Sequence, residues 1–295
     1  MAGIIDEISN EMSSLYDLKQ GDRIISSHHV PCLQCDYCLK GQESLCLQFK
    51  STNFNPGAFC EYLELSEAHL KHTVHKIPSH LSDEEASFVE PVACCIKAME
   101  RCFQQLSSRA TAGSVAISPR KLNEVLVIGL GSIGLIMGQV VKHYMPSAEV
   151  TGLDLIEDRL KLAQELGFDN AISSLSHPDT QPPRHFDYIF LCAGSSATVD
   201  LAIKHARNGA TIIVFSSVAD SSKAFANNDI YYKELTVLGS YSPNLSNLKE
   251  SLELISSGII KVQKLITQRA SLEKLGEIIK LCNGNQGIKT YLSIK

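Results

Sequence analysis

Between residues 124 and 239 the chain repeats one pattern, a short apolar run followed by a longer amphipathic stretch. The apolar runs have the length of strands and lie at residues 125–128, 149–154, 188–192, 211–215 and 235–239. The intervening stretches have helical spacing, most clearly at residues 157–166 and 197–207. Strands that alternate with helices are typical of a parallel sheet covered on both faces. The pattern therefore predicts an α/β fold built on a doubly wound parallel sheet.

The two flanking regions follow a different pattern. Residues 1–80 predict short strands joined by turns, including a half-buried strand over 57–65. Next, residues 82–85 form a capping box that opens a helix, and Pro91 interrupts the pattern, so a second helix is expected over 92–106. Residues 244–294 again read as helix, strand, helix and strand. These two ends are expected to form another domain.

Composition narrows the class of protein. A length of 295 residues favours two domains, and an apolar content of 44% is ample for a core. The net charge of −5 gives no basic footprint for nucleic acid or an anionic membrane. No signal peptide or membrane-spanning run is visible, so a cytoplasmic protein is expected. Ten cysteines in such a chain indicate thiolates and metal rather than a disulfide framework.

Three glycines follow the strand predicted at residues 125–128. Gly129, Gly131 and Gly134 have the G-x-G-x-x-G spacing and lie between a predicted strand and a predicted helix. The first glycine permits a tight turn, the second lets the backbone approach a pyrophosphate, and the third allows close packing of helix on strand. The helix N-terminus would face the phosphates. The motif predicts dinucleotide binding, and the alternative is a doubly wound domain whose crevice is empty.

An acidic residue completes this fingerprint. Asp154 ends the strand predicted at residues 149–154, twenty positions after Gly134. A carboxylate there can accept hydrogen bonds from the adenosine ribose and would repel a 2′-phosphate. Asp154 therefore favours NAD over NADP.

The ends of the other strands supply candidate lining residues. Ligands of such sheets bind beyond the carboxyl ends of the strands. The residues at those ends are Cys192, Ala193, Phe215, Ser216, Ser217, Ser240 and Tyr241. They are predicted to line the cofactor site.

Four cysteines near the start form the most specific metal signal. Cys32, Cys35, Cys38 and Cys46 have the spacing C-x2-C-x2-C-x7-C. Four thiolates can enclose one tetrahedral Zn²⁺, and a closed shell of sulfurs is structural because no position remains for substrate. An iron–sulfur cluster is the alternative, but ferredoxins that begin in this way place the fourth cysteine after three residues and before a proline. We predict structural zinc.

Glu90 lies in an apolar setting before Pro91. Burying a carboxylate there costs free energy unless a cation or a hydrogen-bond donor meets it. One interpretation is an ordinary acid at a helix N-terminus. The other is a carboxylate at a metal centre.

Together these motifs resemble the zinc-dependent medium-chain dehydrogenases. The four-cysteine lobe, Glu90, the glycine turn and Asp154 come in that family's order, and the sorbitol and threonine dehydrogenase branch is the most similar. The resemblance implies a Rossmann domain beside an incomplete GroES-like β-barrel domain. Residues 1–95, with a zinc lobe at 28–50, and 241–295 would form the barrel domain, and residues 96–240 the Rossmann domain. Homodimers or homotetramers are implied.

The resemblance also assigns cofactor and metal residues by position. It places Ser132 and Ile133 at the pyrophosphate turn and Arg159, with Asp154, near the adenosine ribose. Glu90 matches the carboxylate beside the family's catalytic zinc. The family's other ligands, a cysteine and a Gly-His-Glu motif, precede the cysteine lobe, whereas residues 1–9 resemble the strand that follows that motif. The chain is therefore expected to start after these ligands.

Two functions remain open. The first is a zinc-dependent oxidoreductase that transfers a hydride between a secondary alcohol or polyol and NAD. The second is a catalytically inactive module or partner subunit that binds NAD and structural zinc. A zinc-ribbon nucleic-acid binder would need a basic face, which the composition denies. The sequence does not name the alcohol.

Overall fold

The computed structural model describes residues 1–110, 123–173, 185–217, 225–282 and 287–294. Contacts divide the chain into two compact units. Unit 1 consists of Met1–Cys94 and Ser242–Lys295, and unit 2 is Cys95–Tyr241. The first unit is therefore built from both ends of the chain.

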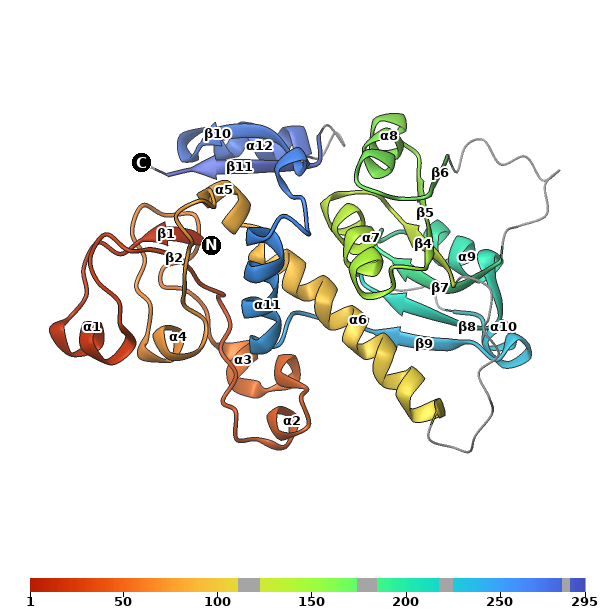
Figure 1. Cartoon of the computed structure of the whole chain (residues 1–295), viewed down its shortest axis with the longest axis horizontal. Coiled ribbons are helices and arrows are strands. Elements are labelled where there is room, and N and C mark those ends of the chain that lie inside the picture. The colour runs from red at the N-terminus through yellow and green to blue at the C-terminus, as the bar shows by residue number, and fades with distance from the viewer. Residues whose placement is uncertain (111–122, 174–184, 218–224, 283–286, 295) are drawn as a thin grey trace. The chain divides into compact units, whose positions relative to one another are not determined.

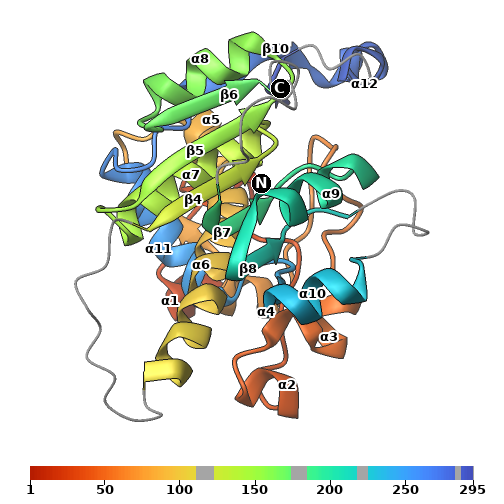
Figure 2. The same cartoon turned by 90° about the vertical axis from the view of Figure 1, so that its right-hand side faces the viewer.

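Unit 2 contains a six-stranded parallel sheet (Figure 1 and Figure 2). Its strands are β4 (Glu124–Ile128), β5 (Glu149–Asp154), β6 (Asn170–Ser173), β7 (Phe186–Leu191), β8 (Ala206–Val214) and β9 (Thr236–Gly239). Their spatial order is β6-β5-β4-β7-β8-β9, and all neighbours are parallel. The order reverses direction between β4 and β7, which is the switch point of a doubly wound sheet. The predicted fold class is confirmed.

The central strand explains the apolar run at residues 125–128. Val125 pairs with Val150 on one side and with Tyr188 on the other. All four residues of the run are at most 1% exposed. A strand covered on both faces has no polar face to show, so its sequence does not alternate.

The helices of unit 2 lie against this sheet. Those in contact with its strands are α7 (Ser132–Tyr144), α8 (Glu157–Glu165), α9 (Ser196–His205) and α10 (Asn227–Lys233), and most of the helix that begins at Val89 also belongs to this unit. In α8, Leu160 and Ala163 are buried, three residues apart, as the helical spacing predicted. Among the helices that the structure describes, none is both long and apolar enough to cross a membrane.

The helix α6 (Val89–Ala110) begins earlier than predicted. The sequence placed a restart at residue 92, because Pro91 interrupts the pattern, and that boundary is wrong. Pro91 lies in the first turn, where a backbone N–H would have no intrahelical acceptor in any case. Proline is therefore compatible with this helix start.

Unit 1 combines two small sheets with short helices. β1 (Ala2–Ile4), β2 (Arg23–Ile25) and β3 (His75–Lys76) are antiparallel, and β10 (Ile266–Ser271) pairs in parallel with β11 (Lys289–Ser293). The helices are α1 (Asn10–Tyr16), α2 (Asp36–Leu39), α3 (Leu47–Ser51), α4 (Glu67–His72), α5 (Asp83–Ala86), α11 (Leu245–Ser256) and α12 (Leu275–Cys282). Single-turn 3-10 segments are η1 (Glu43–Leu45), η2 (Gln263–Leu265) and η3 (Leu272–Lys274). Ile5, Leu18 and Ile24 form a buried cluster.

The half-buried strand predicted at residues 57–65 is wrong. Only one isolated bridge, between Asn55 and Glu64, forms in this region. Phe59 and Tyr62 are 65% and 72% exposed, so the partial alternation does not face a core. Pro56 has no N–H to donate to a ladder, which also disfavours a strand.

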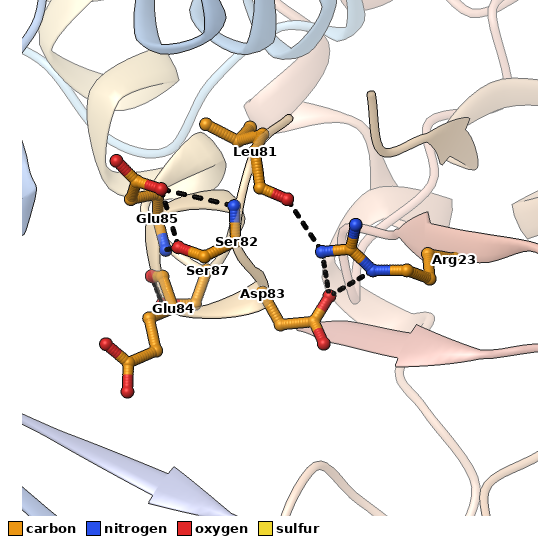
Figure 3. Close-up of polar contacts among 7 residues, drawn as sticks. All are labelled: Arg23, Leu81, Ser82, Asp83, Glu84, Glu85 and Ser87. Carbon is orange, nitrogen blue, oxygen red and sulfur yellow. Dashed lines mark hydrogen bonds and ion pairs between the residues drawn. The ribbon is translucent and has the colours of Figure 1, made fainter. Parts of the chain in front are cut away.

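Three consecutive acids of α5 each stabilise a different part of unit 1. Ser82 and Glu85 form the predicted capping box, in which Glu85 N donates to Ser82 Oγ and Ser82 N donates to Glu85 Oε2 (Figure 3). Asp83 accepts two hydrogen bonds from Arg23 of β2, at 2.7 and 3.0 Å. Glu84 accepts two from Arg269 of β10, at 2.7 and 2.8 Å. One helical turn thus joins β2 to β10.

Arg23→Met should lower the free energy of unfolding by about 1–2 kcal/mol, because hydrogen bonds between charged groups are lost. Arg23 also donates to the carbonyl of Leu81 at 2.7 Å, and its side chain is only 29% exposed. Denaturant unfolding measures the loss.

The matched control is Lys161→Met in α8. Lys161 pairs with Asp158 at 3.9 Å, and both side chains are more than half exposed. We expect a change of less than about 0.5 kcal/mol. Equal losses in both variants would contradict a structural role for the Arg23 contacts.

Candidate functional site

The glycine turn after β4 has the geometry that a pyrophosphate site needs. Gly129 has a φ of +90°, and its N–H donates to Leu153 O at 2.8 Å. A Cβ on Gly134 would lie 1.8 Å from the carbonyl oxygen of Gly129, so helix α7 packs on the turn with no room for a side chain. A Cβ on Gly131 would meet nothing within 4 Å. The backbone at Gly131 is therefore open to a ligand.

The start of α7 supplies donors at the same place. Gly131 is the N-cap residue, and no side chain caps the helix. Ser132 and Ile133 form the first turn, whose N–H groups have no intrahelical acceptor. The first turn has no acidic residue, and the last turn contains Lys142 and His143, which complement the helix dipole. This arrangement favours an anion at the helix N-terminus.

Asp154 is joined directly to the glycine turn. Its Oδ2 accepts from the backbone N–H of Leu130 at 2.7 Å, and its Oδ1 accepts from Leu155 and Ile156 at 2.7 and 2.9 Å. Arg159 Nη1 lies 3.7 Å from Oδ2. The carboxylate is 8% exposed. Sequence spacing indicated that Asp154 and the glycines act together, but it gave no sign of the bond to Leu130.

The residues expected at the other strand ends lie at the carboxyl edge of the sheet. Cys192 N donates to Ile128 O at 2.9 Å, Ser216 Oγ to Leu191 O at 3.2 Å, and Ser240 N to Val214 O at 3.1 Å. Ala193 Cβ would lie 2.5 Å from a Cβ on Gly129. The chain at Ser217 packs closely against Gly194, since a Cβ on Gly194 would lie 2.0 Å from Ser217 O. Tyr241 is 60% exposed. These contacts place the end of β7 beside that of β4, the end of β8 beside that of β7, and the end of β9 beside that of β8.

Cys192 is not an activated nucleophile. Burial raises the pKa of its thiol to about 12. At neutral pH the sulfur is therefore protonated, and the thiolate is the nucleophilic form. Cys192 can contribute shape to this edge of the sheet, but not covalent chemistry.

The four cysteines of the lobe meet in unit 1. Their sulfurs all lie within 4.8 Å of one another, with Cys35 and Cys38 at 3.6 Å and Cys32 and Cys38 at 4.0 Å. Four sulfurs about 2.3 Å from a tetrahedral zinc lie about 3.8 Å apart. The donor set therefore fits one zinc ion. The ion would be held by Cys32 and Cys35, which precede α2, by Cys38 within α2, and by Cys46, which precedes α3.

The backbone around Cys46 favours a thiolate. Burial alone would raise the pKa of this thiol, but N–H groups of Cys32 and Phe49 donate to the sulfur, and the pKa is lowered to about 6. A thiolate is the form that ligates zinc. His28 and His29 are outside the cluster, and His29 Nδ1 pairs with Thr52 O at 2.6 Å.

Glu90 lies in the first turn of α6, half-buried. Its Oε1 accepts a hydrogen bond from the thiol of Cys94 at 3.2 Å. Within the described residues, the only group of three or more potential metal ligands is the four-cysteine cluster. A catalytic zinc needs three protein ligands and an open position. The described residues around Glu90 do not fit such an ion.

Two family models match the chain. One, described as alcohol dehydrogenase GroES-like domain, matches residues 1–79, and the other, described as zinc-binding dehydrogenase, matches residues 132–257. Together these ranges cover about two-thirds of the chain.

Curated relatives are similar over most of the chain. D-altritol 5-dehydrogenase from Agrobacterium fabrum is 28% identical over 91% of this chain and 75% of its own length. Sorbitol dehydrogenase from Bombyx mori is 25% identical over 100% of this chain and 80% of its own length.

A solved structure shares the fold. It is described as a short chain alcohol dehydrogenase from Escherichia coli CFT073 complexed with NADH. Its TM-score is 0.75 at 23% identity, over 99% of this chain and 82% of that chain.

Proposed function

Since the chain belongs to the zinc-dependent medium-chain dehydrogenases, we propose that it is an NAD-linked oxidoreductase of the alcohol and polyol class. The observation that carries the proposal is the glycine turn in direct hydrogen-bond contact with Asp154. When bound, NAD would supply the hydride acceptor. The curated relatives named above act on polyols by name, which supports this substrate class.

The residues of the sheet edge divide between the two halves of the cofactor. Gly131, Ser132 and Ile133 would bind the pyrophosphate. Asp154 and Arg159, at the end of β5, would hold the adenosine ribose. Because β5 and β7 flank β4 on opposite sides, the nicotinamide half would extend toward the ends of β7, β8 and β9. Cys192, Ala193, Ser216, Ser217, Ser240 and Tyr241 would line that half.

Asp154→Asn should raise the affinity for NADPH about tenfold, a change of about 1.4 kcal/mol, while NADH binding changes less. The substitution keeps the size of the side chain and removes the charge that repels a 2′-phosphate. It also releases Arg159, which could pair with that phosphate. Fluorescence titration with both reduced cofactors measures the effect.

Asp158→Asn is the matched control. Asp158 lies in helix α8, four residues after Asp154, and its side chain is 93% exposed and pairs with Lys161. It should leave both affinities unchanged. Equal affinity of the unaltered chain for NADH and NADPH would show that Asp154 does not face the ribose.

The zinc at the four cysteines would be structural. A closed sulfur shell leaves no coordination position for an alcohol. We expect about one zinc per chain on metal analysis. The described residues around Glu90 do not fit a second zinc, so two zincs per chain would contradict this view.

Polyol-dependent reduction of NAD tests the function. The purified chain is supplied with NAD and a panel of polyols and secondary alcohols, and NADH absorbance is followed. The proposal predicts reduction that requires a polyol and that Gly131→Ala suppresses. If the chain bound NADH but no alcohol supported the reduction of NAD, the result would instead favour the inactive NAD- and zinc-binding module. The names of the relatives do not favour that alternative.

Assembly through the sheet is part of the proposal. β9 is the last strand of the six-stranded sheet, and an edge strand presents unpaired backbone groups. Pairing of β9 with the same strand of a second copy would give the expected homodimer or, with a further contact, a homotetramer. A cytoplasmic location stays a prediction.

A further inference from the structure

Lys97 is a buried lysine in helix α6. It is 4% exposed, whereas Ile96 and Ala98 on either side are fully buried apolar residues. Its Nζ donates a hydrogen bond to the carbonyl oxygen of Tyr241 at 3.1 Å. Lys97 and Tyr241 both belong to unit 2, in which α6 passes the carboxyl end of β9 (Figure 1).

A lysine is a costly choice for this position. Lysine is almost never fully buried unless it is paired, because its amino group must be taken out of water. An apolar side chain would fill this buried position without that cost. The hydrogen bond from the amine fixes the position of the backbone at Tyr241, two residues after β9.

Ser240, the residue before Tyr241, has a polar atom that lacks a protein partner. Among the described residues, Ser240 Oγ is one of the few buried side-chain polar atoms with no hydrogen bond. Most buried polar side-chain atoms in proteins are hydrogen-bonded, so a buried hydroxyl without a protein partner is a candidate group for binding a ligand. Ser240 lies at the end of β9, on the side of the sheet where the nicotinamide half would extend.

We propose that Lys97 is a positioning residue, which fixes the backbone at Tyr241 so that the Ser240 hydroxyl meets the carboxamide of the nicotinamide ring. This inference rests on the proposed function, because it requires NAD at the sheet edge. A carboxamide has two N–H donors and one acceptor, so a hydroxyl can pair with either. Lys97 acts through the backbone and does not touch the cofactor.

Binding of two ligands separates this role from a structural one. ADP-ribose contains the adenosine and both phosphates of NADH but lacks the nicotinamide. Lys97→Met should weaken NADH binding about tenfold and change ADP-ribose binding by less than about twofold. Lys97→Arg, which keeps a cationic donor, should restore part of the NADH affinity. An equal loss of affinity for NADH and ADP-ribose, or no loss of affinity for either, would overturn the proposal.

Ser240→Ala provides a test that does not depend on the folding of the Lys97 variants. Removing a buried hydroxyl without a partner should leave the thermal stability of the free protein unchanged or higher. The same change should weaken NADH binding about threefold to tenfold and spare ADP-ribose. Unchanged NADH affinity would overturn the role of the hydroxyl. If neither ligand bound the unaltered chain, the failure would lie with the proposed cofactor site itself.

Discussion

Gly134→Ala should lower the free energy of unfolding by about 3 kcal/mol and abolish NADH binding. The added methyl group would lie 1.8 Å from the carbonyl oxygen of Gly129 and 2.9 Å from its carbonyl carbon. Neither atom can move without displacing the turn, because the N–H of Gly129 is hydrogen-bonded to the carbonyl oxygen of Leu153 in β5. Denaturant unfolding and a fluorescence titration with NADH measure the two losses.

Gly131→Ala is the matched variant, and its two effects should have opposite signs. Gly131 has a φ of −69°, which alanine adopts without strain, and a methyl group would meet nothing within 4 Å. A compatible glycine-to-alanine change stabilises by roughly 0.4–1 kcal/mol, chiefly by restricting the unfolded chain. The methyl group should nevertheless keep a pyrophosphate from the backbone and weaken NADH binding about tenfold or more. Undiminished NADH binding by this variant would show that phosphates do not approach Gly131.

Cys46→Ser should release the zinc and lower the stability of unit 1 by several kcal/mol. Structural zinc contributes roughly 10–16 kcal/mol of apparent binding free energy in small zinc-dependent domains. Here the four cysteines are the donors, so loss of one leaves an incomplete shell. Metal analysis of the purified variant and its thermal unfolding check the expectation.

Cys60→Ser is the control for this experiment. Cys60 lies outside the cluster, and its thiol donates to Gly57 O at 2.9 Å, a contact that serine preserves. It should retain about one zinc per chain. Equal zinc content in both variants would contradict zinc binding by the four cysteines. Detection of iron together with sulfide absorption would indicate an iron–sulfur cluster instead of zinc.

The central strands of the parallel sheet were predictable because they are buried on both faces, whereas β6, whose four residues are all only partly buried, was not predicted. In a run such as residues 125–128 every side chain is apolar, because the strand is central in the sheet, between β5 and β7, and is covered on both faces. The predicted helices 157–166 and 197–207 each lie within two residues of α8 and α9. Local spacing was sufficient for these elements.

Unit 1 was harder to predict because its elements are short. The strand expected at residues 57–65 rested on a partial alternation, and strand pairing depends on a partner that the segment itself does not specify. The start of α6 was misplaced because Pro91 reads as a break, although the first turn tolerates it. The first error comes from tertiary context, and the second from a position in the helix at which proline is tolerated.

The candidate site was predictable in its motifs and not in its contacts. Spacing alone identified Gly129, Gly131, Gly134 and Asp154, but the bond between Asp154 and Leu130 depends on how β5 lies beside β4. Nothing in the sequence indicated that Lys97 is buried, since one lysine in an amphipathic helix usually faces solvent. Its bond to Tyr241 joins residues 144 positions apart.

Titration of the unaltered chain with NADH tests the central claim most directly, namely that the glycine turn and Asp154 bind a nicotinamide dinucleotide. Enhanced nicotinamide fluorescence would report binding, and displacement by ADP-ribose would confirm that the adenosine half is held. We expect saturation at one NADH per chain, with weaker binding in Gly131→Ala. No saturable binding, or saturable binding that Gly131→Ala leaves unchanged, would contradict the account.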